Sequence, residues 1–481
     1  MNMLKNSSKS NLELDDISCL LRRNKSFFSN PDKIREIKKN VFDFSEDYKL
    51  FLNSAKTERE VVKFTRNLAI SKGFEEFNNN KNYTAGDKVF VENRNKNIIL
   101  AVVGTQGLKL GANIIVSHID CPRLDLKQNP LYEIDQLACM KTQYYGGIRK
   151  YQWLSIPLAI HGRVSLKNGE HIDIVAGEFN DDYCFCITDL LPHLASEQMK
   201  KSISNVFIGE NLKVIVGSEG LIDSENNLDN KHDKHAIKLK VLDILHKKYG
   251  ITEVDFAFSE FEIVPSFQAR DIGFDKALIG AYGHDDRCCS YAGLQAILDK
   301  NAPKSTSILA FVDKEEVGSD GNTGAKSVFL RNFIADFAEL ENLKTRNVIS
   351  KSRCISADVD GAFDPTFPEH FDNQNCSWVN RGVALTKYTG SRGKSGASDA
   401  SEEFLSYIRN ILESNNITWQ SAALGKVDVG GGGTVAKYLA NLGMDVVDMG
   451  IPVLSMHSPF EIISKYDLYE TFSFFKCFYA G

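Results

Sequence analysis

The stretch FVDKEEVGS, residues 311–319, ends an apolar run and carries two adjacent carboxylates. The run from Ser307 to Val312 predicts a buried strand. Successive side chains on a strand point to opposite faces, but where the backbone turns at its end, Glu315 and Glu316 can face one cleft. One carboxylate could then bind a metal ion while the other handles a proton. For an isolated pair of glutamates, a solvated loop is the simpler interpretation. A metal site is the better interpretation only if the rest of the chain supplies further ligands.

The composition is typical of a globular protein with more than one domain. The chain has 481 residues, of which 25% are charged, and a net charge of -6 at pH 7. This charge argues against a nucleic-acid binder with a basic surface. No apolar run approaches the ~20 residues that span a bilayer, and residues 1–16 lack the apolar core of a signal peptide. The ten cysteines form no C-x-x-C pair, which fits reduced thiols in a cytoplasm.

Strand-like and helical patterns alternate along most of the chain. Strands are expected at 98–103, 114–116, 307–312 and 354–357, and helices at 50–68, 286–300, 324–340 and 400–415. This alternation predicts an α/β fold, with a mainly parallel sheet covered by helices on both faces. The segment 128–264 has a different, β-rich character. We therefore expect one domain built from 1–127 and 265–481, with 128–264 inserted into it.

Residues with metal-binding side chains stand where strands are expected to end or helices to begin, which is where sites form in open α/β sheets. These residues are His118, Asp285, Glu316, Asp358 and His457. Each residue alone is weak evidence for a metal site. Asp285 could cap a helix, Asp358 could stabilise a turn, and a lone histidine is more often structural. Together they suit two divalent ions, with Zn²⁺ favoured and Co²⁺ or Mn²⁺ compatible. Glu315 would then remain as a general base.

Five motifs in one order make the chain resemble the M18 metallo-aminopeptidases, typified by aspartyl aminopeptidase. They are S-H-I-D at 117–120, D-D-R at 285–287, D-K-E-E-V-G-S at 313–319, S-A-D at 356–358 and M-H-S at 456–458. The resemblance covers nearly the whole chain. It implies a zinc-exopeptidase fold with an inserted dimerisation domain, and removal of N-terminal residues, with acidic ones as a candidate preference, from short peptides. It also implies dimers assembled into a homo-oligomeric dodecamer.

The resemblance also implies a role for each residue of the metal site. His118 and Asp358 would complete one zinc site, and Glu316 and His457 the other. Asp285 would bridge the two sites. Glu315 would take a proton from the attacking water and later pass it to the leaving amine.

Three more residues receive roles from the resemblance. Asp120 would orient His118 and raise its basicity. His193, in the segment P-H-L-A at 192–195, would reach a neighbouring subunit's site and stabilise the developing oxyanion. From spacing alone, His193 reads as a surface histidine at a helix start. Lys387 matches a lysine near the substrate pocket and could pair with an acidic side chain, although a surface lysine is about as good an interpretation.

Two other functions stay open at the level of the sequence. The chain could be a catalytically silent, metal-bound assembly protein, or a related two-metal hydrolase such as a deacylase. The presence of Glu315 argues against the first, since a silent protein needs no general base. The extent of the resemblance, which includes the insertion, argues against the second.

Overall fold

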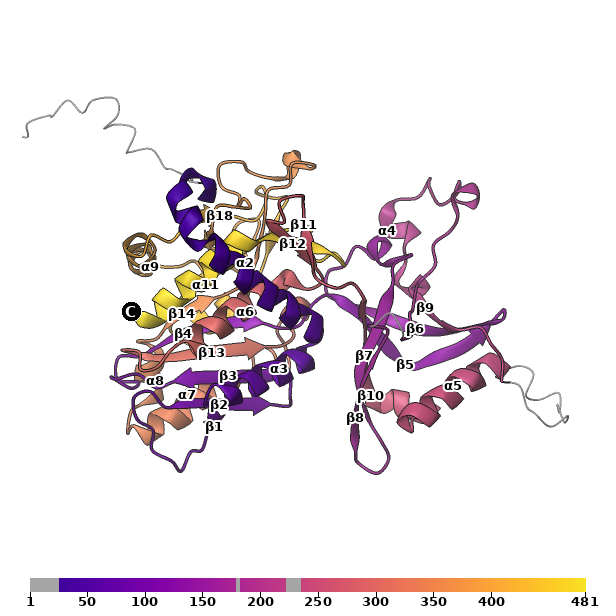
Figure 1. The fold of residues 1–481 in the computed structure, drawn as a ribbon, viewed down its shortest axis with the longest axis horizontal. Helices are drawn as coiled ribbons and strands as arrows, with labels where there is room; N and C mark the ends of the chain where they lie inside the picture. Colours follow the sequence, from indigo (N-terminus) through magenta and orange to yellow (C-terminus); the bar gives the residue numbers. More distant parts are fainter. Residues whose placement is uncertain (1–25, 179–181, 222–234) are drawn as a thin grey trace, which may run out of the picture.

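The fold is known from a computed structural model that describes residues 26–178, 182–221 and 235–481 (Figure 1). The polar N-terminus, for which the sequence predicts no signal peptide, lies outside these ranges. Within the described residues, no helix is both long and apolar enough to cross a bilayer. Two large sheets dominate the structure and lie side by side in Figure 1.

The larger sheet has nine strands in the order β1-β2-β3-β13-β4-β14-β20-β16-β18. Its central strands β13, β4, β14 and β20 run parallel, whereas β3 and β16 pair antiparallel with their neighbours β13 and β20. The strands are β1 (Glu75–Glu76), β2 (Lys88–Asn93), β3 (Asn97–Val102), β4 (Ala112–His118), β13 (Thr306–Val312), β14 (Arg353–Ser356), β16 (Val383–Thr386), β18 (Trp419–Ala422) and β20 (Asp445–Gly450). The parallel centre was expected, because its strands read as continuous apolar runs.

Helices cover both faces of this sheet and bury a separate apolar cluster on each. One face packs against α2 (Pro31–Ser54), α3 (Glu58–Ser71), α6 (His284–Leu298), α9 (Glu402–Ser414) and α11 (Lys465–Ala480). The other face packs against α7 (Phe329–Leu340), α8 (Thr345–Ile349) and α10 (Ala436–Ala440). The predicted α/β class, with helices on both faces of a mainly parallel sheet, is therefore confirmed.

Two expected helices have different starts in the structure. The pattern at 50–68 is divided, because α2 ends at Ser54 and a new capping box at Thr57 and Glu60 starts α3. The helix expected from residue 324 begins only at Phe329. Gly324 instead closes a turn, where an added Cβ would lie 2.1 Å from the Ser319 carbonyl oxygen.

The second sheet is antiparallel and has six strands in the order β8-β7-β10-β5-β6-β9. They are β5 (Arg123–Ile134), β6 (Leu137–Tyr145), β7 (Leu158–Ser165), β8 (His171–Ala176), β9 (Lys213–Gly217) and β10 (Ser259–Pro265). This sheet and α5 (Ala236–Tyr249) bury an apolar cluster of their own. The sheet occupies the β-rich segment expected from the sequence, and its first strand begins at Arg123, slightly before residue 128.

A smaller, five-stranded sheet has the order β11-β12-β22-β21-β15. Its strands are β11 (Arg270–Ile272), β12 (Leu278–Ala281), β15 (Asp360–Gly361), β21 (Pro452–Leu454) and β22 (Glu461–Ser464). Because β12 and β21 both pair with β22, the segments that follow β12 and β21 are held close together. Those segments carry Asp285 and His457.

A buried histidine joins the six-stranded sheet to α3, a helix that packs on the nine-stranded sheet. His161 on β7 contacts the Glu60 carboxylate of α3 through Nδ1 at 2.7 Å, and the Glu178 carboxylate through Nε2 at 2.8 Å. Lys56 Nζ lies 2.7 Å from the second oxygen of Glu178. Since both ring nitrogens donate to carboxylates, the ring is an imidazolium. Burial alone would lower the pKa of His161, but Glu178 and Glu60 raise it to about 9.

This contact predicts that stability falls in alkaline solution. The folded-state pKa of His161 is raised, so its contribution is fully present below the unfolded pKa of about 6.5 and disappears as pH rises through about 9. The shift corresponds to a contribution on the order of 3 kcal/mol. Urea midpoints of the parent protein and of His161→Gln should therefore differ most near pH 6 and converge by pH 10. A difference that does not vary with pH would show that His161 is not charged in the folded protein.

Candidate metal centre

The two adjacent glutamates lie in a short 3-10 turn, Glu315–Val317, directly after β13. Lys314 before the turn and Gly318 after it both have left-handed backbone angles, with φ of 66° and 97°. These angles break the alternation of the strand. The side chains of Glu315 and Glu316 therefore line the same cavity, as the sequence predicts for a strand end.

The other candidate ligands follow strands of the nine-stranded sheet and of the five-stranded sheet. His118 is the last residue of β4, and Asp358 follows β14 by two residues, so both lie at the carboxyl edge of the parallel strands. Asp285 lies in the first turn of α6, after β12, and His457 lies in the turn after β21. The fold thus brings residues from five distant segments, including the Glu315 turn, to one point.

Asp285 stands between the two histidines. Its Oδ1 lies 3.1 Å from His118 Nε2, and its Oδ2 lies 3.1 Å from His457 Nε2. It does not cap α6, whose N-cap is Gly283. Its backbone N–H donates to Glu461 Oε2 at 3.0 Å. The carboxylate therefore offers one oxygen to each imidazole.

Each histidine has its own carboxylate partner in addition to Asp285. His118 Nε2 lies 3.7 Å from Asp358 Oδ1, and His457 Nε2 lies 3.3 Å from Glu316 Oε1. The ligand atoms of His118, Asp285 and Asp358 all lie within 4.8 Å of one another, as do those of Asp285, Glu316 and His457. Two candidate ligand sets thus share Asp285, and a third set at the same site joins His118, Glu315 and Glu316.

The orientation of the imidazoles fits a divalent cation. Nδ1 of His118 donates to the Asp120 carbonyl at 2.9 Å, and Nδ1 of His457 donates to the Gly147 carbonyl at 3.0 Å. A neutral ring fixed in this way turns the lone pair of Nε2 towards the carboxylate oxygens of Asp285. Two acceptors at such a distance need a proton or a cation between them. Imidazole and carboxylate are ligands that zinc accepts, and the tethered Nδ1 atoms match the usual support of zinc-bound histidines.

The electrostatics of the cluster also favour a cation. Burial, followed by the nearby carboxylate of Asp358, raises the pKa of Glu315 to about 9. Burial and the charge of Asp285 raise the pKa of Glu316 to about 7. Burial alone would lower the pKa of His457, but Asp285 and Glu316 raise it to about 12. Closely spaced, buried carboxylates repel one another, and a bound cation relieves that repulsion.

Asp120 is fully buried and accepts hydrogen bonds from the backbone of both glutamates. Its Oδ1 accepts the Glu315 backbone N–H at 3.1 Å, and its Oδ2 accepts that of Glu316 at 3.2 Å. Oδ1 also lies 3.4 Å from His118 Nδ1. The family resemblance implies the contact with His118 but not the contacts with the two glutamate backbones.

The candidate ligands Asp285, Glu316, Asp358 and His457 line a cavity of about 290 Å³. The run Gly430–Gly433 lines it, and so do the cationic side chains of Arg392, Lys394 and Lys426. Lys387 is exposed and is not among the lining residues, although Thr386 and Tyr388 on either side of it are. His193, in the 3-10 turn Pro192–Leu194, is also exposed and outside the lining.

Glu461 is a functional candidate that the sequence does not reveal. Its carboxylate accepts the backbone N–H of His457 at 2.6 Å and that of Asp285 at 3.0 Å. It therefore ties two candidate ligands to β22. No strand end, paired acid or ligand-like spacing marks Glu461, because its role depends on the pairing of β12 and β21 with β22.

Comparisons with known proteins identify the family. The model of the family described as "Aminopeptidase I zinc metalloprotease (M18)" matches residues 51–479. A probable M18 family aminopeptidase 1 of Borrelia garinii is 48% identical over 452 residues, which cover 92% of this chain and 97% of the relative. The crystal structure of an M18 aminopeptidase from Thermotoga maritima has a TM-score of 0.89 at 43% identity and covers 95% of this chain and 99% of its own.

A second solved structure, aminopeptidase I from Clostridium acetobutylicum, has a TM-score of 0.87 at 40% identity. It covers 96% of this chain and 100% of its own. The family match therefore extends over both large sheets and every candidate ligand. The chain belongs to the M18 family of zinc metalloproteases, and it is an aminopeptidase.

Proposed function

We propose that this aminopeptidase uses two zinc ions that share Asp285. His118 and Asp358 would hold one ion, and Glu316 and His457 the other. The observation that carries the proposal is the placement of the two Asp285 oxygens, each 3.1 Å from the Nε2 atom of a different histidine. A carboxylate between two ions about 3.5–4 Å apart is the usual bridge in two-metal hydrolases.

In this proposal Glu315 is the general base. Divalent ions supply Lewis acidity and make water a stronger nucleophile at neutral pH. Glu315 lines the cavity, and although its carboxylate also lies near His118 and Glu316, this proposal assigns it to neither ion. Its carboxylate can take a proton from the attacking water and return it to the leaving amine. Burial raises the pKa of Glu315 in the ion-free cluster. Two bound cations would lower that pKa again and so keep the carboxylate ionised, as a general base must be.

The cavity supports a preference for an acidic N-terminal residue, although through different residues from the one expected. Arg392 and Lys426 line the cavity, and within the described residues neither forms an ion pair. Lys394 also lines it but is paired with Asp399 at 2.7 Å. A carboxylate side chain of a substrate could therefore be recognised by Arg392, whose fork suits bidentate contacts. Lys387 is a weaker candidate because its side chain is not part of the lining.

Substituting Arg392 should change selectivity more than rate. In Arg392→Met, kcat/KM for an aspartyl amide should fall about tenfold relative to that for a leucyl amide, because one charge-assisted hydrogen bond is lost. Arg331→Met on the exposed side of α7 is the matched control and should leave the ratio unchanged. A ratio that Arg392→Met also leaves unchanged would exclude Arg392 from side-chain recognition.

We also propose a homo-oligomer that assembles through the six-stranded sheet unit, in a cytoplasm. The segment around α4 (Ile203–Val206) exposes large apolar side chains that a partner subunit would cover. They are Leu190, Leu191, Leu194, Met199 and Ile203. His193 lies within this segment, so a neighbouring subunit's cavity is the site at which it could stabilise an oxyanion. The cysteines within the described residues are free thiols, which fits a reducing compartment.

A panel of aminoacyl chromogenic amides, assayed with added Zn²⁺, Co²⁺ or Mn²⁺, tests the proposal. We expect metal-dependent cleavage of amides with a free α-amino group and no cleavage of their Nα-acetylated forms. A deacylase would instead release acetate from the Nα-acetylated forms and leave the bond to the chromophore intact. An assembly protein without catalytic activity would bind the ions and cleave neither series.

A further inference from the structure

The end of β6 reaches from the six-stranded sheet to the metal centre. The Tyr145 hydroxyl donates to Asp120 Oδ2 at 2.9 Å. Gly147, two residues later, supplies the carbonyl that holds His457 Nδ1. Between them, Gly146 has a φ of 72°, and a Cβ at this position would lie 3.2 Å from the Cβ of Glu316. Three successive residues of β6 and its continuation therefore touch residues of the site.

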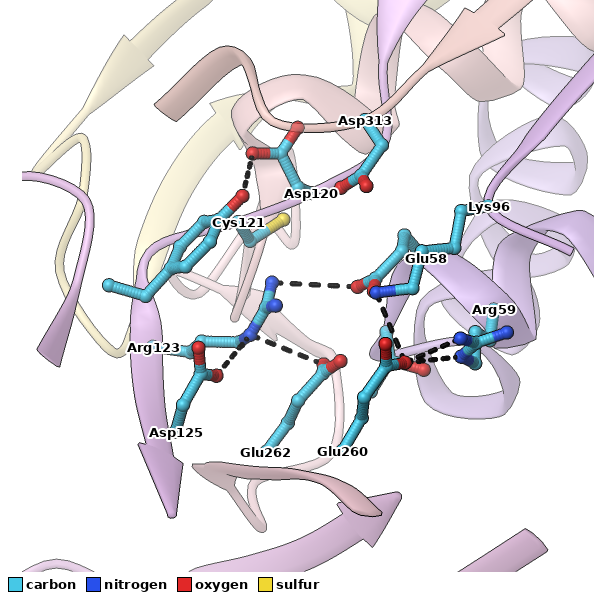
Figure 2. A network of polar contacts seen from close by, with 12 residues as sticks. Glu58, Arg59, Lys96, Asp120, Cys121, Arg123, Asp125, Glu260, Glu262 and Asp313 are labelled. Carbon is cyan, nitrogen blue, oxygen red and sulfur yellow. Dashed lines mark hydrogen bonds and ion pairs between the residues drawn. The ribbon is translucent and has the colours of Figure 1, made fainter. Parts of the chain in front are cut away.

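The ring of Tyr145 is held in place by a buried cation. The Arg123 guanidinium lies 4.0 Å from the centre of the Tyr145 ring. Figure 2 shows this guanidinium among three carboxylates. It lies 2.9 Å from Asp125 and 3.4 Å from Glu262 on its own sheet, and 3.5 Å from Glu58 on α3.

The polar network of Arg123, Asp125, Glu262 and Glu58 includes residues of the six-stranded sheet and of α3. Glu58, which is fully buried, also pairs with Lys96 at 2.8 Å. A guanidinium with three partners has little freedom to move, and its flat face restricts the ring that it covers. The direction of the Tyr145 hydroxyl is thus set by residues of the six-stranded sheet and of α3.

Asp120 is the point at which this network meets the metal centre. Its Oδ2 accepts from both Tyr145 and the Glu316 backbone, while Oδ1 accepts from the Glu315 backbone. Since Asp120 is fully buried, water cannot readily replace a missing donor, and loss of the hydroxyl would leave the carboxylate under-satisfied. A shift of Asp120 would move the backbones of both glutamates.

We propose that Tyr145 is a positioning residue of the metal centre that acts through Asp120. The six-stranded sheet unit then serves the catalytic centre of its own chain, besides any role in assembly. This inference rests on the proposed two-ion site. Tyr145 does not belong to the cavity lining, so its effect passes through Asp120 rather than through contact with the substrate.

The test compares Tyr145→Phe with Tyr144→Phe, its neighbour on β6 with an exposed side chain. Zinc affinity is measured by competition with a chelator, and kcat and KM are measured on one amide. In Tyr145→Phe, ion affinity and kcat should each fall about 10- to 100-fold, as for other residues that orient metal ligands, while KM stays within about twofold. Tyr144→Phe should match the parent protein. If Tyr145→Phe matches Tyr144→Phe in both measurements, the proposal is wrong.

A double-mutant cycle separates positioning from a general loss of stability. If Tyr145 acts through Asp120, Tyr145→Phe should have little further effect on ion affinity in an Asp120→Asn background. Additive effects would contradict the proposal, because they would show that Tyr145 acts by another route.

Arg123→Lys keeps the charge but loses the flat face over the Tyr145 ring, so it should also weaken ion binding. An ion affinity equal to that of the parent protein would show that Arg123 does not help to position Tyr145.

The chelator competition does not depend on peptide cleavage. If the parent protein binds ions but cleaves no amide, the proposed function fails, while the effect of Tyr145→Phe on ion affinity still decides the inference. If the parent cleaves amides and Tyr145→Phe changes neither ion affinity nor kcat, the inference alone fails.

Discussion

Glu315→Gln should abolish most of the activity while keeping the metal. The substitution preserves the size of the side chain and the backbone N–H that Asp120 accepts, but an amide cannot take up the proton. We expect kcat to fall by roughly 10²–10⁴-fold, the usual contribution of a general base. Since Glu315 lies outside both proposed ligand sets, the ion content should stay that of the parent protein. Steady-state kinetics and metal analysis of the same preparation check both statements.

Glu339→Gln is the matched control for this experiment, because Glu339 is exposed on α7, on the other side of the sheet from α6. It should leave kcat unchanged. An excess of Zn²⁺ should restore nothing in Glu315→Gln if the defect lies in proton transfer. Recovery with added zinc would instead make Glu315 a ligand.

Asp285→Asn should lose metal and activity together. The side chain offers one oxygen to each imidazole, and an amide can present only one oxygen, with no charge. Both ions should therefore bind more weakly. We expect kcat/KM at trace metal to fall about 10³-fold or more, because several kcal/mol of charge stabilisation by the ions is lost.

Asp336→Asn on the exposed side of α7 is the control for loss of a negative charge. Unlike the Glu315 variant, Asp285→Asn should regain part of its activity as the zinc concentration rises. If Asp285→Asn retains the parent's ion content and rate, Asp285 does not bridge the ions.

The fold and three of the candidate ligands follow from local features of the sequence. β13, β4 and β14 read as apolar runs, and each ends next to a residue with a metal-binding side chain. Parallel strands place these ends at one edge of the sheet, so His118, Glu316 and Asp358 meet there. Asp285 at an expected helix start and His457 after an apolar run belong to the same predicted group, and the structure places them in the same cluster.

Contacts between segments far apart in the sequence could not be predicted in this way. Glu461 supports Asp285 and His457 only because β22 pairs with both β12 and β21. Tyr145 reaches Asp120 only through the approach of one sheet to the other. Neither residue has a local pattern that points to the site. The sequence likewise does not single out Arg392, because only the folded chain shows that its side chain lines the cavity.

The number of ions that one chain binds tests the central claim most directly. Metal-free protein is titrated with Zn²⁺ while the bound ions and the rate of amide cleavage are followed together. The shared position of Asp285 predicts two ions per chain, with full activity only when both sites are filled. Saturation at one ion per chain with full activity would contradict the two-ion site.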